Sequence, residues 1–392
     1  MVLLLVVIYI TFISLGLPDS LFGVAWPLAH VDFNLAESFG SVYSVIIALC
    51  TGGISFFAGA LIKKFGTGLV TAFSVVLTAV GMLIISFAPN VYVMMLGSVV
   101  SGLGAGAIDT GLNNYVSLNY KAIHMNWLHC FWGVGVTVSP LIMSLFLKNG
   151  DWQMGYRTIS YVQFGISAIV FASLVLWRKY DKKATETSVA EAEMVEIKEK
   201  VSIKKILLTP GVITAILSLG FYCSIEFLMG TWGASFLINA KGLSADKAAQ
   251  MVSLYYGGIM LGRFISGIIS LKVNDRDLIR GGTAVLLFGV VMLAIPTVVT
   301  TYIGMVAVGI GCAPIFPATL HAVPDRFGKE MSAYITGYQM GGAYAVGFIM
   351  QVVFGYVATA TTFQITPYVL IVFAVLTIIM VEITNEKTRR RV

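Results

Sequence analysis

Charged residues are scarce in this sequence. Asp, Glu, Lys and Arg make up only 11% of the 392 residues, whereas hydrophobic residues make up 58%. A soluble globular domain carries charge on about a quarter of its residues. The mean hydropathy of +0.89 is likewise too high for a surface that faces water. These values exclude a soluble protein and indicate a chain that lies in a lipid bilayer.

Cysteine and histidine are also rare, and neither forms a ligand pattern. The four cysteines stand singly in apolar stretches, which excludes a disulfide framework and a zinc site. His124 and His129 are five residues apart, the wrong spacing for two ligands on one helix face. No phosphate-binding Walker A pattern is present, which excludes an ATP-driven motor. We expect no enzyme activity, no cofactor and no metal.

Long apolar runs fill most of the chain. Each is close to the roughly 20 residues that a helix needs to cross the hydrocarbon core. The runs are continuous rather than alternating, which is typical of helices and not of a β-barrel. The sequence therefore predicts an all-α membrane protein with twelve transmembrane helices, at residues 3–30, 36–62, 67–88, 92–117, 125–147, 156–177, 207–238, 245–271, 278–298, 301–322, 332–358 and 366–385.

One polar stretch divides these spans six and six. Residues 178–205 hold eight Lys or Arg and six Asp or Glu. We predict an N-terminal six-helix bundle over 1–177, a cytoplasmic linker over 178–206, and a C-terminal six-helix bundle with a short tail over 207–392. Most of the 25 basic residues lie in the linker, the tail and the loops on the same side. The positive-inside rule places that side, with both termini, in the cytoplasm. We therefore expect a multi-pass protein of the cytoplasmic (inner) membrane.

A weak internal repeat relates the two halves. A shift of 207 residues places Asp19 on Glu226 and Gly102 on Gly309. Duplicated six-helix halves with a binding site near the bilayer midplane are typical of secondary transporters that work by rocking. We therefore expect two pseudo-symmetric halves.

Four ionisable residues stand deep within the spans: Asp19, Asp109, Glu226 and Arg263. An ionisable group at the bilayer centre costs about 2.5–3.5 kcal/mol, so such residues are functional candidates. The three acids are candidates for proton coupling, because a carboxyl group loses its charge when it binds a proton. Arg263 is assigned a structural or gating role, bonding either helix ends or an acid at the gate. For Asp109 a polar contact between helices stays open, and for Asp19 a helix cap.

Polar and aromatic side chains accompany these acids. Asn113 follows Asp109 by four residues and shares its helix face, where its amide can donate to and accept from a hydroxylated ligand. Aromatic faces stack on sugar rings. The candidate substrate-binding residues are Asn113, Asn114, Trp26, His129, Trp132, Trp232 and Gln339. An interfacial anchor for Trp232 and a packing role for His129 are the alternatives.

Several stretches resemble one family of transporters. They are "LPDSLFG" in span 1, "GLGAGAIDTGLNNYV" in span 4, "LHCFWGVGVTVSPL" in span 5, "FYCSIEFLMGTW" in span 7, "GRFISG" in span 8 and "IFPATL" in span 10. With the twelve spans and the linker, the chain resembles the major facilitator superfamily, and within it the fucose–glucose–galactose:proton symporter branch and its sodium-dependent glucose transporter-like relatives. In that family, acids in spans 1 and 4 matter for proton coupling and sugar recognition. The resemblance implies these roles for Asp19 and Asp109.

The chain departs from the family pattern at two places. The loop after span 2 usually reads Gly-x-x-x-Asp-Arg-x-Gly, but here it is "GALIKKFG". Lys63 stands where the aspartate belongs, so the usual cytoplasmic salt bridge cannot form and the gate must be held in another way. The span-4 acid is followed by "TGLNNY" without the proline of the family, which leaves the substrate open.

The sequence thus favours a secondary active transporter. Our first hypothesis is proton-coupled symport of a hexose or deoxyhexose by alternating access, with Na⁺ as the other coupling ion to consider. Proton-driven export of amphipathic compounds is the alternative. A non-transporting membrane receptor is a weaker one, because the linker and the tail are short. The expected partners are a small-molecule substrate and the lipid bilayer, with no nucleic acid, and we expect a monomer.

Overall fold

The computed structural model describes residues 2–120, 122–177 and 206–389. Within these ranges, it does not describe the side chains of Phe56, Asn114, Ser117, Leu118, Ala122, Ile123, Asn126, Lys329, Glu330 and Ala333. The chain divides into two compact units, residues 1–199 and 200–392, called here unit 1 and unit 2. All but the last residue of the predicted linker lies outside the described residues, so its structure stays a prediction.

Every predicted span is helical in the described residues, which contain no strand. The helices of unit 1 are α1 (Val2–Asp19), α2 (Leu21–Asp32), η1 (Glu37–Phe39), α3 (Gly40–Phe65), α4 (Thr67–Ser86), α5 (Val91–Asn119), α6 (Ala122–Leu147) and α7 (Trp152–Ala172). Those of unit 2 are α10 (Val212–Asn239), α11 (Ala245–Ile269), α12 (Asp275–Ala294), α13 (Val298–Cys312), α14 (Ile315–His321), α15 (Val323–Phe327), α16 (Lys329–Ala360), η2 (Phe363–Ile365) and α17 (Thr366–Thr388).

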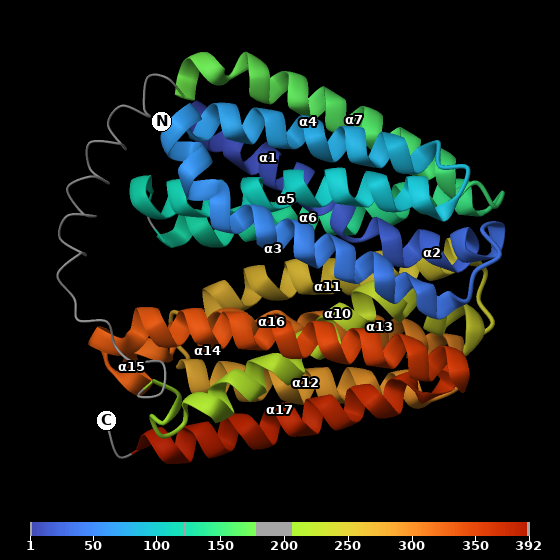
Figure 1. Ribbon diagram of the computed structural model, residues 1–392. Helices are drawn as coiled ribbons and strands as arrows, with labels where there is room; N and C mark the ends of the chain where they lie inside the picture. The colour runs from blue at the N-terminus through green and yellow to red at the C-terminus, as the bar shows by residue number, and fades with distance from the viewer. Residues whose placement is uncertain (1, 121, 178–205, 390–392) are drawn as a thin grey trace. The chain divides into compact units, whose positions relative to one another are not determined.

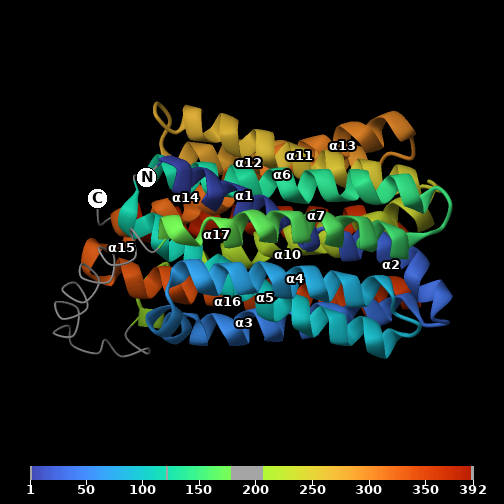
Figure 2. The ribbon, with the colours of Figure 1, turned by 90° about the horizontal axis from the view of Figure 1, so that it is seen from above.

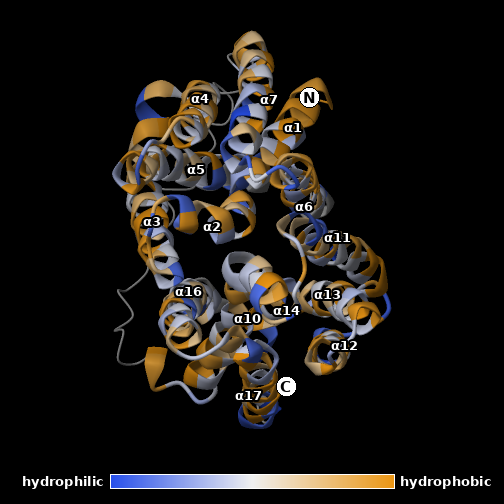
Figure 3. Ribbon diagram, turned by 90° about the vertical axis from the view of Figure 1, so that its right-hand side faces the viewer, coloured by the Kyte–Doolittle hydropathy of each residue, from blue (hydrophilic) through white to orange (hydrophobic). Residues whose placement is uncertain are grey.

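The helices have the length and polarity of membrane spans. Eleven of the described helical segments are long and apolar enough to cross a bilayer. The sixth predicted span, 156–177, is also helical over most of its length, as α7, but this helix carries the polar residues Gln153, Arg157 and Gln163. Within each unit the long helices run side by side (Figures 1 and 2), and hydrophobic residues predominate along them (Figure 3). The prediction of an all-α membrane protein is confirmed.

The first span is broken at the acid that the sequence singled out. α1 ends at Asp19 and α2 begins at Leu21. Pro18 has no backbone N–H to give to the helix. Ser20, between the two helices, turns its hydroxyl to α6 and donates to the carbonyl of Val136 at 3.0 Å. The break therefore places Asp19 at the end of a helix, in the middle of a membrane span.

Two glycines bring α1 and α6 into close contact. A Cβ atom on Gly16 of α1 would collide with the carbonyl oxygen of Trp132, and one on Gly135 of α6 would collide with that of Ile13. Small residues allow such an approach between membrane helices, where van der Waals packing rather than the hydrophobic effect drives association. The seam between α1 and α6 thus fixes the position of the broken segment.

Glycines that the internal repeat pairs make matching contacts in the two units. A Cβ on Gly102 would press on α3, and one on Gly309 would press on α11. A Cβ on Gly104 would meet the backbone of α4, and one on Gly311 the backbone of α12. Because α3 and α11 occupy the same place in the repeat, as do α4 and α12, the two units are built alike.

We expect Gly135→Ala to destabilise the protein. The added methyl group forces α1 away from α6, and overpacking of this kind costs about 1–3 kcal/mol. The midpoint of thermal unfolding in detergent should fall. Gly165→Ala on α7 is the matched control, because a Cβ there meets nothing within 4 Å and alanine favours the helix. Equal midpoints for the two variants would contradict the close contact.

Candidate functional site

Asp19 is held by one partner from α6. Its carboxylate is exposed, and the indole N–H of Trp132 donates to Oδ2 at 2.8 Å. No other hydrogen bond to Asp19 occurs among the described residues. The Oδ1 atom is therefore available to a proton or to a substrate hydroxyl.

Asp109 is held in the same way, by a neighbour on its own helix. It is exposed on α5, and the amide of Asn113 donates to its Oδ1 at 2.8 Å and to its backbone oxygen at 3.0 Å. The predicted sharing of one helix face is thus observed, with Asn113 directed at the acid. Oδ2 of Asp109 accepts no hydrogen bond from the part of the chain that the structure describes.

The two acids of unit 1 act on each other. α1 contacts both α5 and α6, and Asp19 and Asp109 are close enough for their charges to interact. Neither forms an ion pair with a described basic residue. His129 is half-buried on α6, where its ring meets the edge of Phe12 at a centroid distance of 5.9 Å. Unit 1 thus gathers two carboxylates without a cation between them.

Glu226 has the opposite environment in unit 2. The hydroxyl of Tyr222 donates to its Oε2 at 2.6 Å, and the guanidinium of Arg263 lies 3.7 Å from its Oε1. The side chains of the ion pair are each only 16% exposed. Of the two partners expected for Arg263, helix ends or an acid, the structure shows an acid, Glu226. The four-residue spacing of Tyr222 and Glu226 on one helix was an unused signal of their contact.

Three predicted substrate-binding residues lie in the protein interior. Trp26, Trp232 and Gln339 are all 0% exposed. Each donates an N–H to a backbone carbonyl, Trp26 to η1, Trp232 to α16 and Gln339 to α10. In this structure they join helices rather than line an open site. The side chain of Asn114 lies outside the described residues.

Lys63 is exposed in the last turn of α3. The ion pairs of the described residues at the end predicted to be cytoplasmic lie in unit 2 instead. Arg280 of α12 makes two bonds of 2.7 Å to Glu382 of α17, and His321 of α14 lies 2.8 Å from Asp275. These contacts connect the ends of three helices within unit 2.

Sequence analysis missed one polar contact in the seam between α1 and α6. His124, considered only as a metal ligand, lies with its Nδ1 3.1 Å from the hydroxyl of Tyr9. The two residues are 115 positions apart, so no local pattern could have indicated the pair. The seam consequently carries polar groups at His124, His129 and Asp19.

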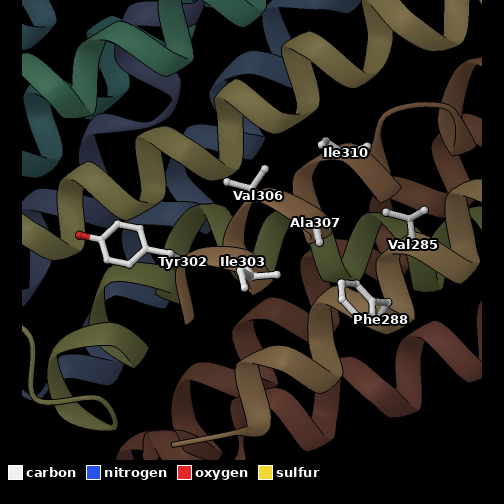
Figure 4. A pocket seen from close by; sticks show the side chains of 7 residues that line it. All are labelled: Val285, Phe288, Tyr302, Ile303, Val306, Ala307 and Ile310. Carbon is white, nitrogen blue, oxygen red and sulfur yellow. The ribbon is translucent and has the colours of Figure 1, made fainter. Parts of the chain in front are cut away.

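A groove of about 590 Å³ lies in unit 2. Its lining side chains come from α12 and α13 and include Phe288, Tyr302 and Val306 (Figure 4). The Tyr302 hydroxyl is the one polar side-chain group among them, and none of the predicted site residues takes part. Such a surface suits hydrocarbon and offers no hydrogen-bond pattern for a sugar.

Comparison with known proteins identifies the family. A family model described as Major Facilitator Superfamily matches residues 8–347 and 242–391. The chain therefore belongs to the major facilitator superfamily and is a transporter of that class. The glucose/mannose transporter GlcP of Bacillus subtilis is 22% identical over 395 residues, 97% of this chain and 94% of that protein. A glucose/galactose transporter of Brucella abortus is 24% identical over 74% of this chain and 73% of its own length.

Other relatives carry other functions. The efflux pump DEP3 of Fusarium langsethiae is 26% identical over 144 residues, which cover 35% of this chain and 26% of the pump. A crystal structure of the peptide transporter POT in complex with sulfate superposes with a TM-score of 0.75, at 12% identity over 98% of this chain and 95% of that one. The structural likeness supports the fold alone.

We expect the Glu226–Arg263 pair to behave as a unit in stability measurements. Arg263→Leu leaves a mostly buried carboxylate without its cation, and breaking a buried pair in this way costs about 3–5 kcal/mol. The double variant Glu226→Gln/Arg263→Leu removes both charges and should regain most of the loss. Thermal unfolding of the wild type, both single variants and the double variant measures the coupling. Additive losses would show that the pair does not contribute as an ion pair.

Proposed function

We propose that this transporter is a proton-coupled sugar symporter in which Asp19 and Asp109 of unit 1 take part in coupling. The observation that carries the proposal is that the hydrogen-bonding capacity of these two carboxylates is only partly used within the protein. Each has one carboxylate oxygen bound by an N–H donor and the other without a hydrogen bond from the described residues. A carboxylate in a membrane span is costly unless it is paired or protonated.

A proton is the natural partner for this pair of acids. Two negative charges within electrostatic reach repel each other, and one bound proton removes that repulsion. Protonation also favours closure of the site around the substrate, because a neutral carboxyl group is less costly to remove from water. Transport then follows from alternating access of the two six-helix halves. Glu226 is already compensated by Arg263 and Tyr222, so we assign it to structure within unit 2.

A sugar fits the remaining features of unit 1. The free oxygens of Asp19 and Asp109 can accept hydrogen bonds from hydroxyl groups, and Trp132 provides an aromatic ring beside one of them. The Bacillus relative is a glucose/mannose transporter and the Brucella relative a glucose/galactose transporter, which supports the same substrate class. The efflux-pump relative and the apolar groove on α12 and α13 favour the second candidate, export of amphipathic compounds.

The experiment is uptake into liposomes containing the purified protein. Labelled hexoses and deoxyhexoses are supplied under an inward pH gradient, an inward Na⁺ gradient or no gradient. We expect accumulation of one or a few sugars under the pH gradient alone. Accumulation under the Na⁺ gradient instead would identify Na⁺, not H⁺, as the coupling ion. Uptake of no sugar under either gradient would refute the proposal and direct the search to amphipathic compounds.

We expect Asp109→Asn to abolish accumulation under the pH gradient and to retain exchange of labelled for unlabelled sugar, since exchange requires no net proton movement. Asp151→Asn is the matched control. Asp151 caps α7 by accepting from the Met154 N–H, and asparagine caps a helix equally well. Loss of exchange together with accumulation would assign Asp109 to substrate binding instead of coupling.

A further inference from the structure

We propose that Trp132 is the positioning residue of Asp19: its indole N–H fixes which carboxylate oxygen is left for the proton and the substrate, and the indole responds when that oxygen is protonated. The role of Trp132 in transport rests on the proposed function, whereas the contact of its indole with Asp19 does not. It assigns to Trp132 the donor function of its ring nitrogen, in addition to any stacking by its ring.

The geometry holds the two residues at a set distance. Gly16 and Gly135 bring the backbones of α1 and α6 together next to the pair. One residue beyond Asp19, the Ser20 hydroxyl lies 2.7 Å from the hydroxyl of Ser139, and both are fully buried. The 2.8 Å bond from the indole to Oδ2 therefore joins two segments whose relative movement is restricted on both sides.

The chemistry of the bond makes it sensitive to protonation. The indole N–H is a donor only, and a bond from it to an ionised carboxylate is roughly twice as strong as one to a neutral group. With Oδ2 occupied, an incoming proton binds Oδ1. The carboxyl group then becomes neutral, the bond to the indole weakens, and the indole ring is freer to rearrange against a bound substrate.

Other titratable groups lie on the described helices that pack against α1, and each needs its own control. They include Asp109 of α5, His124 and His129 of α6, Arg157 of α7, and His30 and Asp32 of α2, and the Tyr43 hydroxyl of α3 also interacts with Asp19. α4 has no charged residue. Replacing each of these groups separately therefore identifies whether a change at Trp132 originates at Asp19.

The first test observes the contact without any substrate. The protein contains six tryptophans, which 5-fluorotryptophan replaces in the full-length chain. Fluorine NMR in detergent then gives a resonance for each, and the one missing from Trp132→Phe belongs to Trp132. We expect that resonance to shift with pH in the wild type and in separate variants of the other titratable groups, such as Asp109→Asn and His129→Gln, and to stay constant in Asp19→Asn. A constant resonance in the wild type, or an unchanged shift in Asp19→Asn, would overturn the inference.

The second test measures uptake of the transported sugar against pH. Trp132→Phe keeps the aromatic ring and removes the donor, so the ionised carboxylate loses a partner and binds a proton more readily. We expect the pH of half-maximal uptake to rise by about one unit. Trp132→Gln restores an N–H donor without the ring and should bring the pH profile back toward the wild type. Trp127→Phe, on the same helix and 48% exposed, is the matched control and should leave the profile unchanged.

These readouts separate the two proposals. A pH-dependent Trp132 resonance in a protein that takes up no sugar would support the positioning role and refute the symport proposal. Sugar uptake with an unchanged pH profile in Trp132→Phe would support the symport proposal and refute the positioning role of Trp132. If Trp132→Phe proves too unstable to purify, Trp132→Gln and Asp19→Asn still decide the question, because the first keeps the bond and the second removes its acceptor charge.

Discussion

The close packing of α1 against α6 determines the arrangement of the candidate site. Gly16 and Gly135 remove the side chains that would separate the two backbones, and the broken segment after Pro18 is joined to α6 by Ser20. Because this seam is tight, the carboxylate of Asp19 reaches the indole of Trp132 across it. A wider separation of the helices would leave an ionised acid in a membrane span without this donor, and a charge within a span is costly.

The two units treat the acids within their membrane spans differently although they are built from the same six-helix plan. In unit 2, Glu226 has a cation and a hydroxyl, and both of its oxygens are occupied. In unit 1, Asp19 and Asp109 interact with each other, and each has a single N–H donor among the described residues. A charge pair in the interior is stable as it is, whereas two unpaired acids are stabilised by taking up a proton. This difference is the physical reason for placing proton coupling in unit 1.

Much of the fold was predictable because it depends on local composition. Continuous apolar runs predict membrane helices. All twelve predicted segments are helical in the described residues, and eleven segments there are long and apolar enough to cross a bilayer. The pair Asp109 and Asn113 was also predictable, since a spacing of four residues places both on one helix face. Contacts between distant segments were not. Nothing in the sequence directs Arg263 to Glu226 rather than to Asp109, or Trp132 to Asp19. Trp26 and Trp232 resembled sugar-binding aromatics, yet their N–H groups bond to backbone carbonyls in the interior, because tryptophan serves equally well in packing and in binding.

The central claim is that the unpaired acids of unit 1 bind the coupling proton together with the sugar. Its most direct test is the proton uptake that follows addition of the transported sugar to purified protein in weakly buffered solution, measured with a pH indicator. The account predicts uptake in the wild type and in Glu226→Gln/Arg263→Leu, where unit 1 is intact, and none in the double variant Asp19→Asn/Asp109→Asn. Proton uptake that persists without the two aspartates would contradict it.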